Sequence, residues 1–274
     1  MMEYPNLLRI RYGHIAPAFG KRYFDEIGKE KDLFRGEMIV TEKVDGSQLA
    51  VGWKNDQPYI QGKNSHIAQF DKRKAYHGAW SWVWENIAKM EMLKGYLVFG
   101  EWLRVQHSLP YDDLPDWFVV FDIWDYENGK FMNWDAVTEF CNRVGFATVP
   151  ELYRGKLKKE DLPALVESRR SRFSSSDILD KTRFNLEERH EIQFSECKGK
   201  TTERFSDGHI FMEGCVVRPL QGPKFQTTKK TTYWINCAKM VVQEFLDEFE
   251  ENAHWTSTRM KENRLARWKD GQGQ

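Results

Sequence analysis

Four apolar segments, far apart in the sequence, each carry charged residues at one end. They read EKVDG at 42–46, FGEWL at 99–103, FMEGCVVRP at 211–219 and CAKMVV at 237–242. Because successive side chains of a strand point to opposite faces of a sheet, strands can direct such charges into one cleft. The sequence therefore predicts a β-rich core whose strand ends converge on a charged site.

The residues around Lys43 alternate between apolar and polar in the manner of strands. Met38 and Val40 precede the lysine, and Leu49 and Val51 follow it. Period-two alternation interrupted by Asp and Gly indicates strands joined by tight turns. We expect a meander of antiparallel strands in this part of the chain, with Lys43 at the end of one strand.

The remaining segments have either strand-like or helix-like periodicity. The strand-like ones are 38–70, 95–103, 117–125, 209–219 and 231–242, and the helix-like ones are 74–93, 135–144 and 158–170. Strands and helices do not alternate regularly, so the pattern is typical of an α+β fold with helices packed outside antiparallel sheets.

Composition excludes several classes of protein. Lys and Arg balance Asp and Glu at 41 each, so the net charge gives no sign of nucleic-acid binding, although a local basic face stays open. Cys141, Cys197, Cys215 and Cys237 form no CxxC pair, so we expect free buried thiols rather than zinc ligands or disulfides. No apolar run is as long as a membrane-spanning helix, and the N-terminus lacks the apolar stretch of a signal peptide. We therefore expect a cytoplasmic protein.

If the four segments converge, the cleft holds Lys43, Glu101, Glu213, Arg218 and Lys239. Carboxylates are hard ligands suited to Mg²⁺, and cations suit a polyphosphate. A lysine that attacks phosphorus must be neutral, yet an ordinary lysine with a pKa of about 10.4 is protonated at pH 7. Neighbouring cations lower this pKa and carboxylates raise it, so the amine needs a loaded site to react.

The order of these motifs resembles the covalent nucleotidyltransferase superfamily. K-x-D-G, F-G-E, an apolar F-D-I strand, E-G-x-V-x-R and a last apolar strand with a lysine follow one another over residues 40–242. That superfamily contains ATP-dependent DNA ligases, RNA ligases and capping guanylyltransferases. TEKVDGSQ, the short FGEWL and VPELYRGKL at 149–157 are most similar to RNA ligases of the T4 RNA ligase 2 type.

The resemblance implies a fold, cofactors and a reaction. The fold would be the α+β nucleotidyltransferase fold of ligase adenylation domains, ATP-grasp-like, with the nucleotide cleft between antiparallel sheets. ATP and Mg²⁺ or Mn²⁺ would be the cofactors. The chain would join RNA ends carrying a 5′-phosphate and a 3′-hydroxyl, in nicked duplex or single strands, with DNA as an open alternative substrate. A minimal DNA ligase, a capping-type guanylyltransferase and a degenerate nucleotide-binding module are the other readings. No membrane and no obligate protein partner is implied.

The resemblance also assigns roles around the first motif. Lys43 would form a lysyl–AMP phosphoramidate, with Glu42 and Asp45 beside it. Gly46 would allow a tight turn near the nucleotide. Lys63 would be a basic residue near the ribose and phosphate.

The later motifs receive roles in the same way. Glu101 would bind the ribose hydroxyls or the metal, and Glu213 would bind the metal. Either Phe118 or Phe121 would stack on the adenine, and the sequence does not choose between them. Lys239 would contact the α-phosphate.

The last motif departs from the family pattern, which ends in two lysines spaced K-x-K. Cys237 stands where the first lysine is expected, two positions before Lys239. Lys229 or Lys230 could substitute from the preceding turn, although a solvated turn is the more ordinary role for that pair.

Chain length bounds the domain organisation. We expect one adenylation domain over 1–242 and a short helical tail over 243–274. About 30 residues are too few for a five-stranded OB domain, so we expect none.

Overall fold

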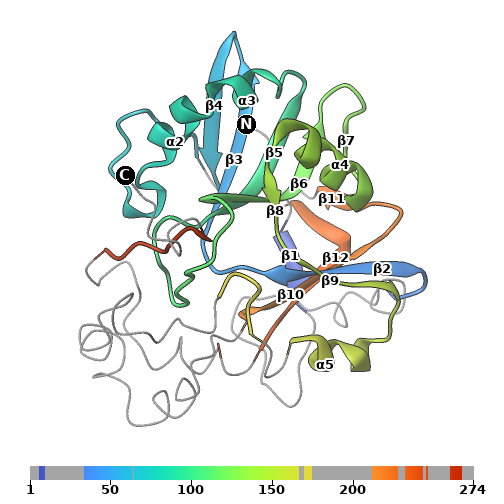
Figure 1. Cartoon of the computed structure of the whole chain (residues 1–274). Helices are drawn as coiled ribbons and strands as arrows, with labels where there is room; N and C mark the ends of the chain where they lie inside the picture. Colours follow the sequence, from blue (N-terminus) through green and yellow to red (C-terminus); the bar gives the residue numbers. More distant parts are fainter. Residues whose placement is uncertain are drawn as a thin grey trace, which may run out of the picture.

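Two six-stranded sheets form the body of the protein, shown by a computed structural model (Figure 1). Sheet A has the strand order β1-β12-β10-β2-β9 with β11 beside β12, and sheet B has the order β4-β3-β5-β6-β7 with β8 beside β6. The structure describes residues 6–9, 34–63, 65–166, 170–174, 212–227, 232–242, 245 and 260–266.

Most strand pairs are antiparallel. Sheet A contains β1 (Asn6–Arg9), β2 (Glu37–Lys43), β9 (Glu151–Lys156), β10 (Gly214–Pro219), β11 (Phe225–Thr227) and β12 (Thr232–Val241). Sheet B contains β3 (Ser47–Lys54), β4 (Gln57–Gly62), β5 (Tyr96–Trp102), β6 (Phe118–Asp125), β7 (Lys130–Phe131) and β8 (Ala147–Thr148). Helices outside mainly antiparallel sheets confirm the α+β prediction.

Short helices cover the outer faces of both sheets. They are α2 (Ala79–Glu85), α3 (Ile87–Glu91), α4 (Trp134–Val144) and α5 (Leu162–Val166), with the 3-10 turns η2 (Lys74–Tyr76) and η3 (Lys159–Asp161). The first three helices share a core with sheet B, and α5 packs under sheet A (Figure 1). Among the described residues, no helix is long and apolar enough to cross a bilayer.

Helix α4 has the start and stop signals that its sequence predicts. The side chain of Asn133 accepts a hydrogen bond from the Ala136 amide and caps the first turn. Gly145 ends the helix with a φ of 81°, a left-handed conformation that favours glycine. The apolar stripe containing Val137 and Phe140 is buried against sheet B.

The expected helix at 74–93 is interrupted in the structure. Gly78 has a φ of 75° and separates the 3-10 turn from α2, and Asn86 lies between α2 and α3. The expected helix at 158–170 begins late, because the 3-10 turn η3 precedes α5 (Leu162–Val166), and residues 167–169 lie outside the described residues. Apolar spacing alone did not reveal these breaks.

The chain crosses from sheet A to sheet B directly after Lys43. Strand β2 ends at Lys43, and strand β3 begins at Ser47 in the other sheet. The next connection is a tight hairpin, in which Asn55 and Asp56 both have positive φ, as a two-residue type I′ turn requires. The charged residues around Lys43 therefore lie where the chain passes from one sheet to the other.

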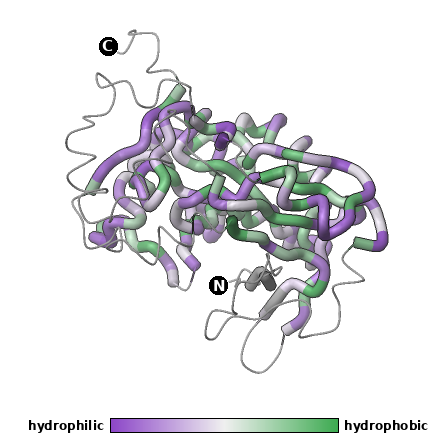
Figure 2. The backbone as a smooth tube through the Cα atoms, turned by 90° about the horizontal axis from the view of Figure 1, so that it is seen from below, coloured by the Kyte–Doolittle hydropathy of each residue, from purple (hydrophilic) through white to green (hydrophobic). Residues whose placement is uncertain are grey.

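A shared apolar cluster holds the two sheets together on one side of this crossing. Phe99 and Phe131 from sheet B pack with Trp234 and Cys237 from sheet A, and the Phe131 and Trp234 ring centroids lie 4.7 Å apart. Figure 2 shows that hydrophobic stretches lie mainly along the interior strands. Each fully buried large apolar side chain contributes on the order of 2 kcal/mol, so the spacing between the sheets is well fixed.

Three of the four cysteines and part of the predicted tail lie among the described residues. Cys141, Cys215 and Cys237 are free and buried, as expected, whereas Cys197 lies outside the described residues. Of the predicted tail, residues 260–266 are irregular and form two isolated bridges with the body, and most of the remainder lies outside the described residues.

Candidate functional site

Strand register brings Lys43 and Glu213 together. Lys43 pairs with Gly214 across β2 and β10, so the residue preceding that glycine lies beside the lysine. The Lys43 ammonium donates a hydrogen bond to Glu213 Oε2. The two side chains are 21% and 8% exposed, which makes this a largely buried, charge-assisted contact.

Two glycines permit the close packing that this geometry needs. Gly214 has a φ of 156°, and a Cβ there would lie 2.0 Å from the Met240 carbonyl oxygen. A Cβ on Gly46 would lie 2.7 Å from the Trp102 carbonyl oxygen and 2.8 Å from Glu101 Cγ. No other residue fits either place without moving backbone, so both glycines are structural requirements of the site.

Glu101 completes the charged cluster from sheet B. It pairs with Gln48 across β3 and β5, and both residues line the same cavity. Burial raises the pKa of Glu101 to about 8, while Lys43 and Lys239 lower it and Glu213 raises it further. A carboxyl group with this pKa carries a proton at neutral pH until a cation arrives to stabilise its charge.

The same carboxylates control the protonation of Lys43. Burial alone would lower the pKa of this lysine, but Glu213, Glu101 and Asp45 together raise it above the ordinary value. Burial raises the pKa of Glu213, and the adjacent Lys43 ammonium opposes that rise. In the free protein the lysine is therefore held as an ammonium and is not yet a nucleophile.

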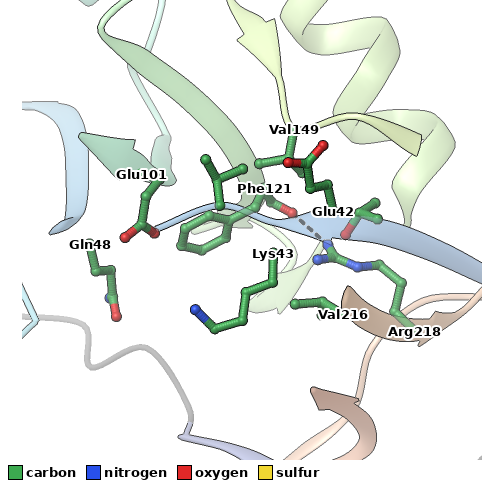
Figure 3. A pocket seen from close by; sticks show the side chains of 10 residues that line it. Glu42, Lys43, Gln48, Glu101, Phe121, Val149, Val216 and Arg218 are labelled. Atoms are coloured by element: carbon green, nitrogen blue, oxygen red, sulfur yellow. Dashed lines mark hydrogen bonds between the residues drawn. The ribbon is translucent and has the colours of Figure 1, made fainter. Parts of the chain in front are cut away.

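A cavity of about 110 Å³ opens beside Lys43. Its lining residues are Thr41, Glu42, Lys43, Val44, Gln48, Glu101, Phe121, Val149, Val216 and Arg218. Figure 3 shows the Lys43 side chain extending below the Phe121 ring toward the side where Glu101 and Gln48 lie. The cavity thus combines an aromatic face, apolar walls and a charged end, which are common features of small-molecule sites.

The structure separates the two candidate stacking residues. Phe121 lines the cavity, whereas Phe118 is fully buried on the other face of β6 against Trp82. Gly100 makes room for the Phe118 ring, because a Cβ at that glycine would lie 2.5 Å from the ring. Phe118 is therefore a core residue, and Phe121 is the candidate that lines the cavity.

Arg218 lines the cavity but is tied to its wall. Its Nη1 donates to the Phe121 carbonyl oxygen at 2.5 Å (Figure 3). The same nitrogen donates to Asp122 Oδ1 at 3.0 Å. Its guanidinium also lies over the Trp134 ring at 5.1 Å. Because Asp122 neutralises much of its charge, this arginine fixes the Phe121 backbone more directly than it offers a phosphate contact.

The last motif places a lysine and a cysteine in different surroundings. Lys239 pairs with Val216, which lines the cavity, and it lowers the pKa of both Glu101 and Glu213. Cys237 is only 3% exposed and packs in the apolar cluster between the sheets. Burial raises the pKa of its thiol well above the ordinary range, so the position has become part of the core.

The acid that precedes Lys43 is held by a distant segment. The Glu42 carboxylate points away from the lysine (Figure 3) and accepts hydrogen bonds from Ser171 Oγ at 2.5 Å and the Arg172 amide at 3.0 Å. Burial raises the pKa of Glu42 to about 7, although these hydrogen bonds oppose the rise. Glu42 therefore anchors the end of β2 rather than facing the ligand.

The acid that follows Lys43 is held by the loop after β5. Asp45 Oδ2 accepts hydrogen bonds from the amides of Ser108 at 2.8 Å and Leu109 at 3.0 Å. The Asp45 amide donates to Tyr111 Oη at 2.9 Å, and His107 Nδ1 lies 3.8 Å from Asp45 Oδ1. The two acids around Lys43 thus fix the crossing turn from both sides.

Several residues of the site carry no sequence signal that would have identified them. His107 and Tyr111 belong to no recognisable motif, and the sequence context of His107 predicts only a structural role. Gln48 closes the TEKVDGSQ stretch, but the sequence assigned it no role. Conversely, Lys63 is exposed just after β4 and does not line the cavity. Lys229 and Lys230 lie outside the described residues.

The donor set fits a divalent cation shared with a polyphosphate. Within the described residues, no three His, Cys, Asp or Glu side chains converge to hold a metal by themselves. Glu101 and Glu213 nevertheless present carboxylates around one lysine, and Mg²⁺ is commonly held by one or two carboxylates plus substrate phosphates. These two residues are the ones that would hold it.

Comparison with known proteins gives a family and a fold. A family model described as RNA ligase matches residues 36–241, about three quarters of the chain. A search of curated proteins returned no match.

Solved structures of a Naegleria gruberi RNA ligase share the fold. A variant with ATP and Mn is 15% identical, with a TM-score of 0.51, and the alignment covers 91% of this chain and 62% of that one. The same ligase with pyrophosphate is 16% identical, with a TM-score of 0.52 and the same coverage. A variant with AMP and Mn is 15% identical, with a TM-score of 0.51 and again the same coverage.

This chain therefore spans about three fifths of the length of the solved ligases that it matches. The identities are too low to carry more than the fold. The family match over most of the chain is the stronger finding, and its limits enclose the cluster of Lys43, Glu101 and Glu213 between the sheets. The chain belongs to the RNA ligase family.

Proposed function

We propose that this protein is an ATP-dependent RNA ligase that works through a lysyl–AMP intermediate. The observation that carries the proposal is the position of Lys43, which lines a cavity with an aromatic face and lies within a cluster of carboxylates. Membership of the RNA ligase family supports the same conclusion. The ATP-, AMP- and pyrophosphate-bound structures of the Naegleria gruberi ligase support ATP and a divalent cation as its cofactors.

In the first step, Lys43 Nζ attacks the α-phosphorus of ATP. An N–P bond forms, the bond to the bridging oxygen of pyrophosphate breaks, and pyrophosphate leaves with that electron pair. The amine must first lose the proton that Glu213, Glu101 and Asp45 favour. When bound, a divalent cation supplies positive charge that offsets these carboxylates and lowers the pKa of the lysine.

The chain's own residues position the nucleotide for this attack. Phe121 presents its ring to the adenine, and Arg218 holds the Phe121 carbonyl in place. Gln48 and Glu101 lie together at the charged end of the cavity, where the ribose would bind. Lys239 provides the cation for the α-phosphate. Catalysis in this arrangement is mostly positioning and charge stabilisation.

Two further steps complete the reaction. AMP passes from Lys43 to a 5′-phosphate end of RNA, which forms a 5′–5′ pyrophosphate linkage and frees the amine. A 3′-hydroxyl then attacks the activated phosphate, a phosphodiester forms and AMP leaves. RNA ends, rather than DNA ends, are proposed as the substrate because of the family to which the chain belongs.

Nucleotide transfer to the protein tests the first step. The protein is incubated with Mg²⁺ and either ATP or GTP radiolabelled at the α-phosphate, followed by denaturing electrophoresis. We expect a covalent label from ATP only. A label from GTP alone would indicate a guanylyltransferase, and no label from either would indicate a binding module without turnover.

Sealing assays then test the substrate. Matched nicked RNA duplex, nicked DNA duplex and single-stranded RNA are compared, and we expect sealing of at least one RNA substrate above that of DNA. Lys239→Ala should lose adenylylation or AMP transfer, whereas Lys224→Ala, at an exposed lysine before β11, should retain both. Equal activity of the two variants would remove Lys239 from the site. Lys229→Ala and Lys230→Ala complete the comparison of phosphate contacts.

A further inference from the structure

Residues 260–266 lie across the loop that grips the turn after Lys43. We call 260–266 the C-terminal strap and 103–114 the brace loop. Main-chain hydrogen bonds join them repeatedly: the Asn263 amide donates to Arg104 O, Gln106 N to Lys261 O, Leu114 N to Arg264 O and Ala266 N to Leu114 O. The strap therefore packs as a further layer on the brace loop, far in sequence from the catalytic motifs.

One side chain of the strap is fully engaged inside the protein. Asn263 is 3% exposed, and its Oδ1 accepts a hydrogen bond from the Tyr111 amide at 2.9 Å. Its Nδ2 donates to the Leu103 carbonyl oxygen at 2.6 Å. The neighbouring Arg264 amide donates to the Tyr111 carbonyl oxygen at 2.8 Å. The strap thus holds the main chain of Tyr111 through both its donor and its acceptor.

Tyr111 connects the strap to the catalytic turn. Its Oη accepts the hydrogen bond of the Asp45 amide at 2.9 Å, and burial raises the pKa of this phenol well above the ordinary value, so it stays neutral. Tyr111 therefore makes one hydrogen bond to Asn263 and another to Asp45. The brace loop also donates the two amide hydrogen bonds that hold the Asp45 carboxylate.

An apolar anchor and a surface ion pair fix the strap itself. Leu265 is 3% exposed and belongs to the same core as the helices of sheet B. Glu262 accepts from Arg104 Nε at 3.0 Å on a partly exposed surface, where an ion pair contributes little to stability. In the strap, Asn263 is connected through Tyr111 to the turn after Lys43, whereas Glu262 makes a surface ion pair with Arg104. Variants of these two residues can therefore be compared as test and control.

We propose that Asn263 is a positioning residue for lysine adenylylation, acting through Tyr111 on the Asp45 turn that carries Lys43. This inference rests on the proposed function. A buried amide that satisfies both a donor and an acceptor fixes its partners in one arrangement, whereas water in its place would allow several. Small displacements of a nucleophile cost rate more than they cost binding, because only the attack geometry is lost.

Steady-state rates of pyrophosphate–ATP exchange, in which lysyl–AMP forms and reverts repeatedly, test the proposal with Asn263→Ala and the control Glu262→Gln. We expect Asn263→Ala to lower kcat at least about tenfold and to leave the KM for ATP within about twofold, at a temperature where the variant is folded. Glu262→Gln should match wild type in both constants. A wild-type kcat for Asn263→Ala would overturn the proposal, as would an equal loss in the control.

Tyr111→Phe provides a second test that keeps the strap contacts intact. This variant removes only Oη, so we expect a kcat loss similar to that of Asn263→Ala, and a double variant whose loss is less than the product of the two. Independent losses that multiply fully would overturn the relay through Tyr111. If Asn263→Ala fails to fold, a wild-type kcat in Tyr111→Phe overturns the proposal by itself.

Hydrogen exchange separates this inference from the proposed function. The Asp45 amide should exchange at least about tenfold faster in Asn263→Ala than in wild type or Glu262→Gln, because it loses a well-placed acceptor. Unchanged exchange would overturn the relay even in an active enzyme. A wild-type protein that forms no AMP adduct would instead refute the proposed function, whatever the exchange rates are.

Discussion

Lys43 donates a hydrogen bond to Glu213, although 170 positions separate them in the sequence. The pairing of β2 with β10 sets this contact, and Gly214 allows the two strands and β12 to approach closely enough. A lysine beside a carboxylate is held as an ammonium, so in the free protein the amine that we propose as the nucleophile is protonated and unreactive. The charge balance of this cluster should therefore govern both the rate and the pH dependence of adenylylation.

Replacing Glu213 with Gln should both slow the reaction and shift its pH dependence. The substitution keeps the volume but removes the charge that raises the pKa of Lys43. We expect adenylylation to fall roughly a hundredfold at saturating metal, since one preorganised charged group is lost. The remaining activity should reach its plateau at a lower pH than in wild type, because the lysine loses its proton more easily.

Rates of AMP-adduct formation between about pH 6 and pH 10 measure both effects. Gly36→Ala is a suitable control, because a Cβ at this glycine contacts nothing within 4 Å. A Glu213→Gln variant with the rate and pH profile of wild type would contradict the assigned role.

The metal requirement should weaken as pH rises through about 8. Burial raises the pKa of Glu101 to about 8, so below that pH a proton occupies the carboxyl group and competes with a cation. At higher pH, Glu101 loses this proton and becomes available to bind the cation. The Mg²⁺ concentration needed for half-maximal rate should therefore fall as the pH rises. Glu101→Gln should remove this dependence, and Glu85→Gln, on an exposed part of α2, should keep it.

Metal titrations at several pH values would distinguish these cases. A half-maximal Mg²⁺ concentration that is independent of pH in wild type would show that Glu101 is not titrating in competition with metal.

Glu42 should make the protein less stable at high pH. Its folded pKa of about 7 lies above its ordinary value of 4.5, so its stabilising contribution is present below about pH 4.5 and is lost as pH rises through about 7. The difference corresponds to at most about 3 kcal/mol of unfolding free energy. Glu42→Gln keeps a polar side chain for Ser171 and Arg172 and should remove this loss.

Urea unfolding at about pH 5 and pH 8 gives the change in unfolding free energy with pH for wild type and for Glu42→Gln. The difference between these two changes is the contribution of Glu42. Glu37→Gln, at the exposed start of the same strand, is the matched control. A pH dependence in Glu42→Gln as steep as in wild type would assign the effect to other groups.

Restoring the family's lysine at position 237 should not improve the enzyme. Cys237 is buried among apolar side chains, and the nearby charge of Arg218 lowers the pKa of its thiol against the larger rise caused by burial. A lysine there would bury a second cation close to that arginine, so we expect Cys237→Lys to lose several kcal/mol of stability. Cys237→Ser, a small polar change at the same place, should lose less.

Thermal or urea unfolding of both variants checks this prediction, with adenylylation measured on the folded fraction. A stable Cys237→Lys variant with a faster rate would mean that the position still belongs to the phosphate site.

The strand motifs were predictable because strands carry local signals. Alternation placed Lys43 on β2 and Glu101 on β5, and the structure brings these two residues to the same cavity. The choice between Phe118 and Phe121 was not predictable, since residues three apart lie on opposite faces and both faces of β6 are apolar. The room that Gly100 leaves for one ring decides it, and that is a tertiary contact.

The supports of the catalytic turn were beyond the reach of sequence. Ser171, Asn263 and Tyr111 act through side-chain hydrogen bonds between irregular segments, which have no periodicity to detect. The strap itself was expected as part of a helical tail, yet Glu262 and Leu265 form isolated bridges with the brace loop. Their conformation follows from main-chain pairing with the brace loop, and such pairing depends on the assembled fold.

Mapping the AMP adduct shows whether Lys43 is the residue that attacks ATP. Wild type, Lys43→Arg and Lys63→Ala are incubated with ATP and Mg²⁺, and the intact proteins and their peptides are weighed by mass spectrometry. The account predicts one AMP per chain on Lys43 in wild type and in Lys63→Ala, and no adduct in Lys43→Arg, because a guanidinium stays protonated and cannot attack phosphorus. An adduct on another residue, or one that persists in Lys43→Arg, would contradict it.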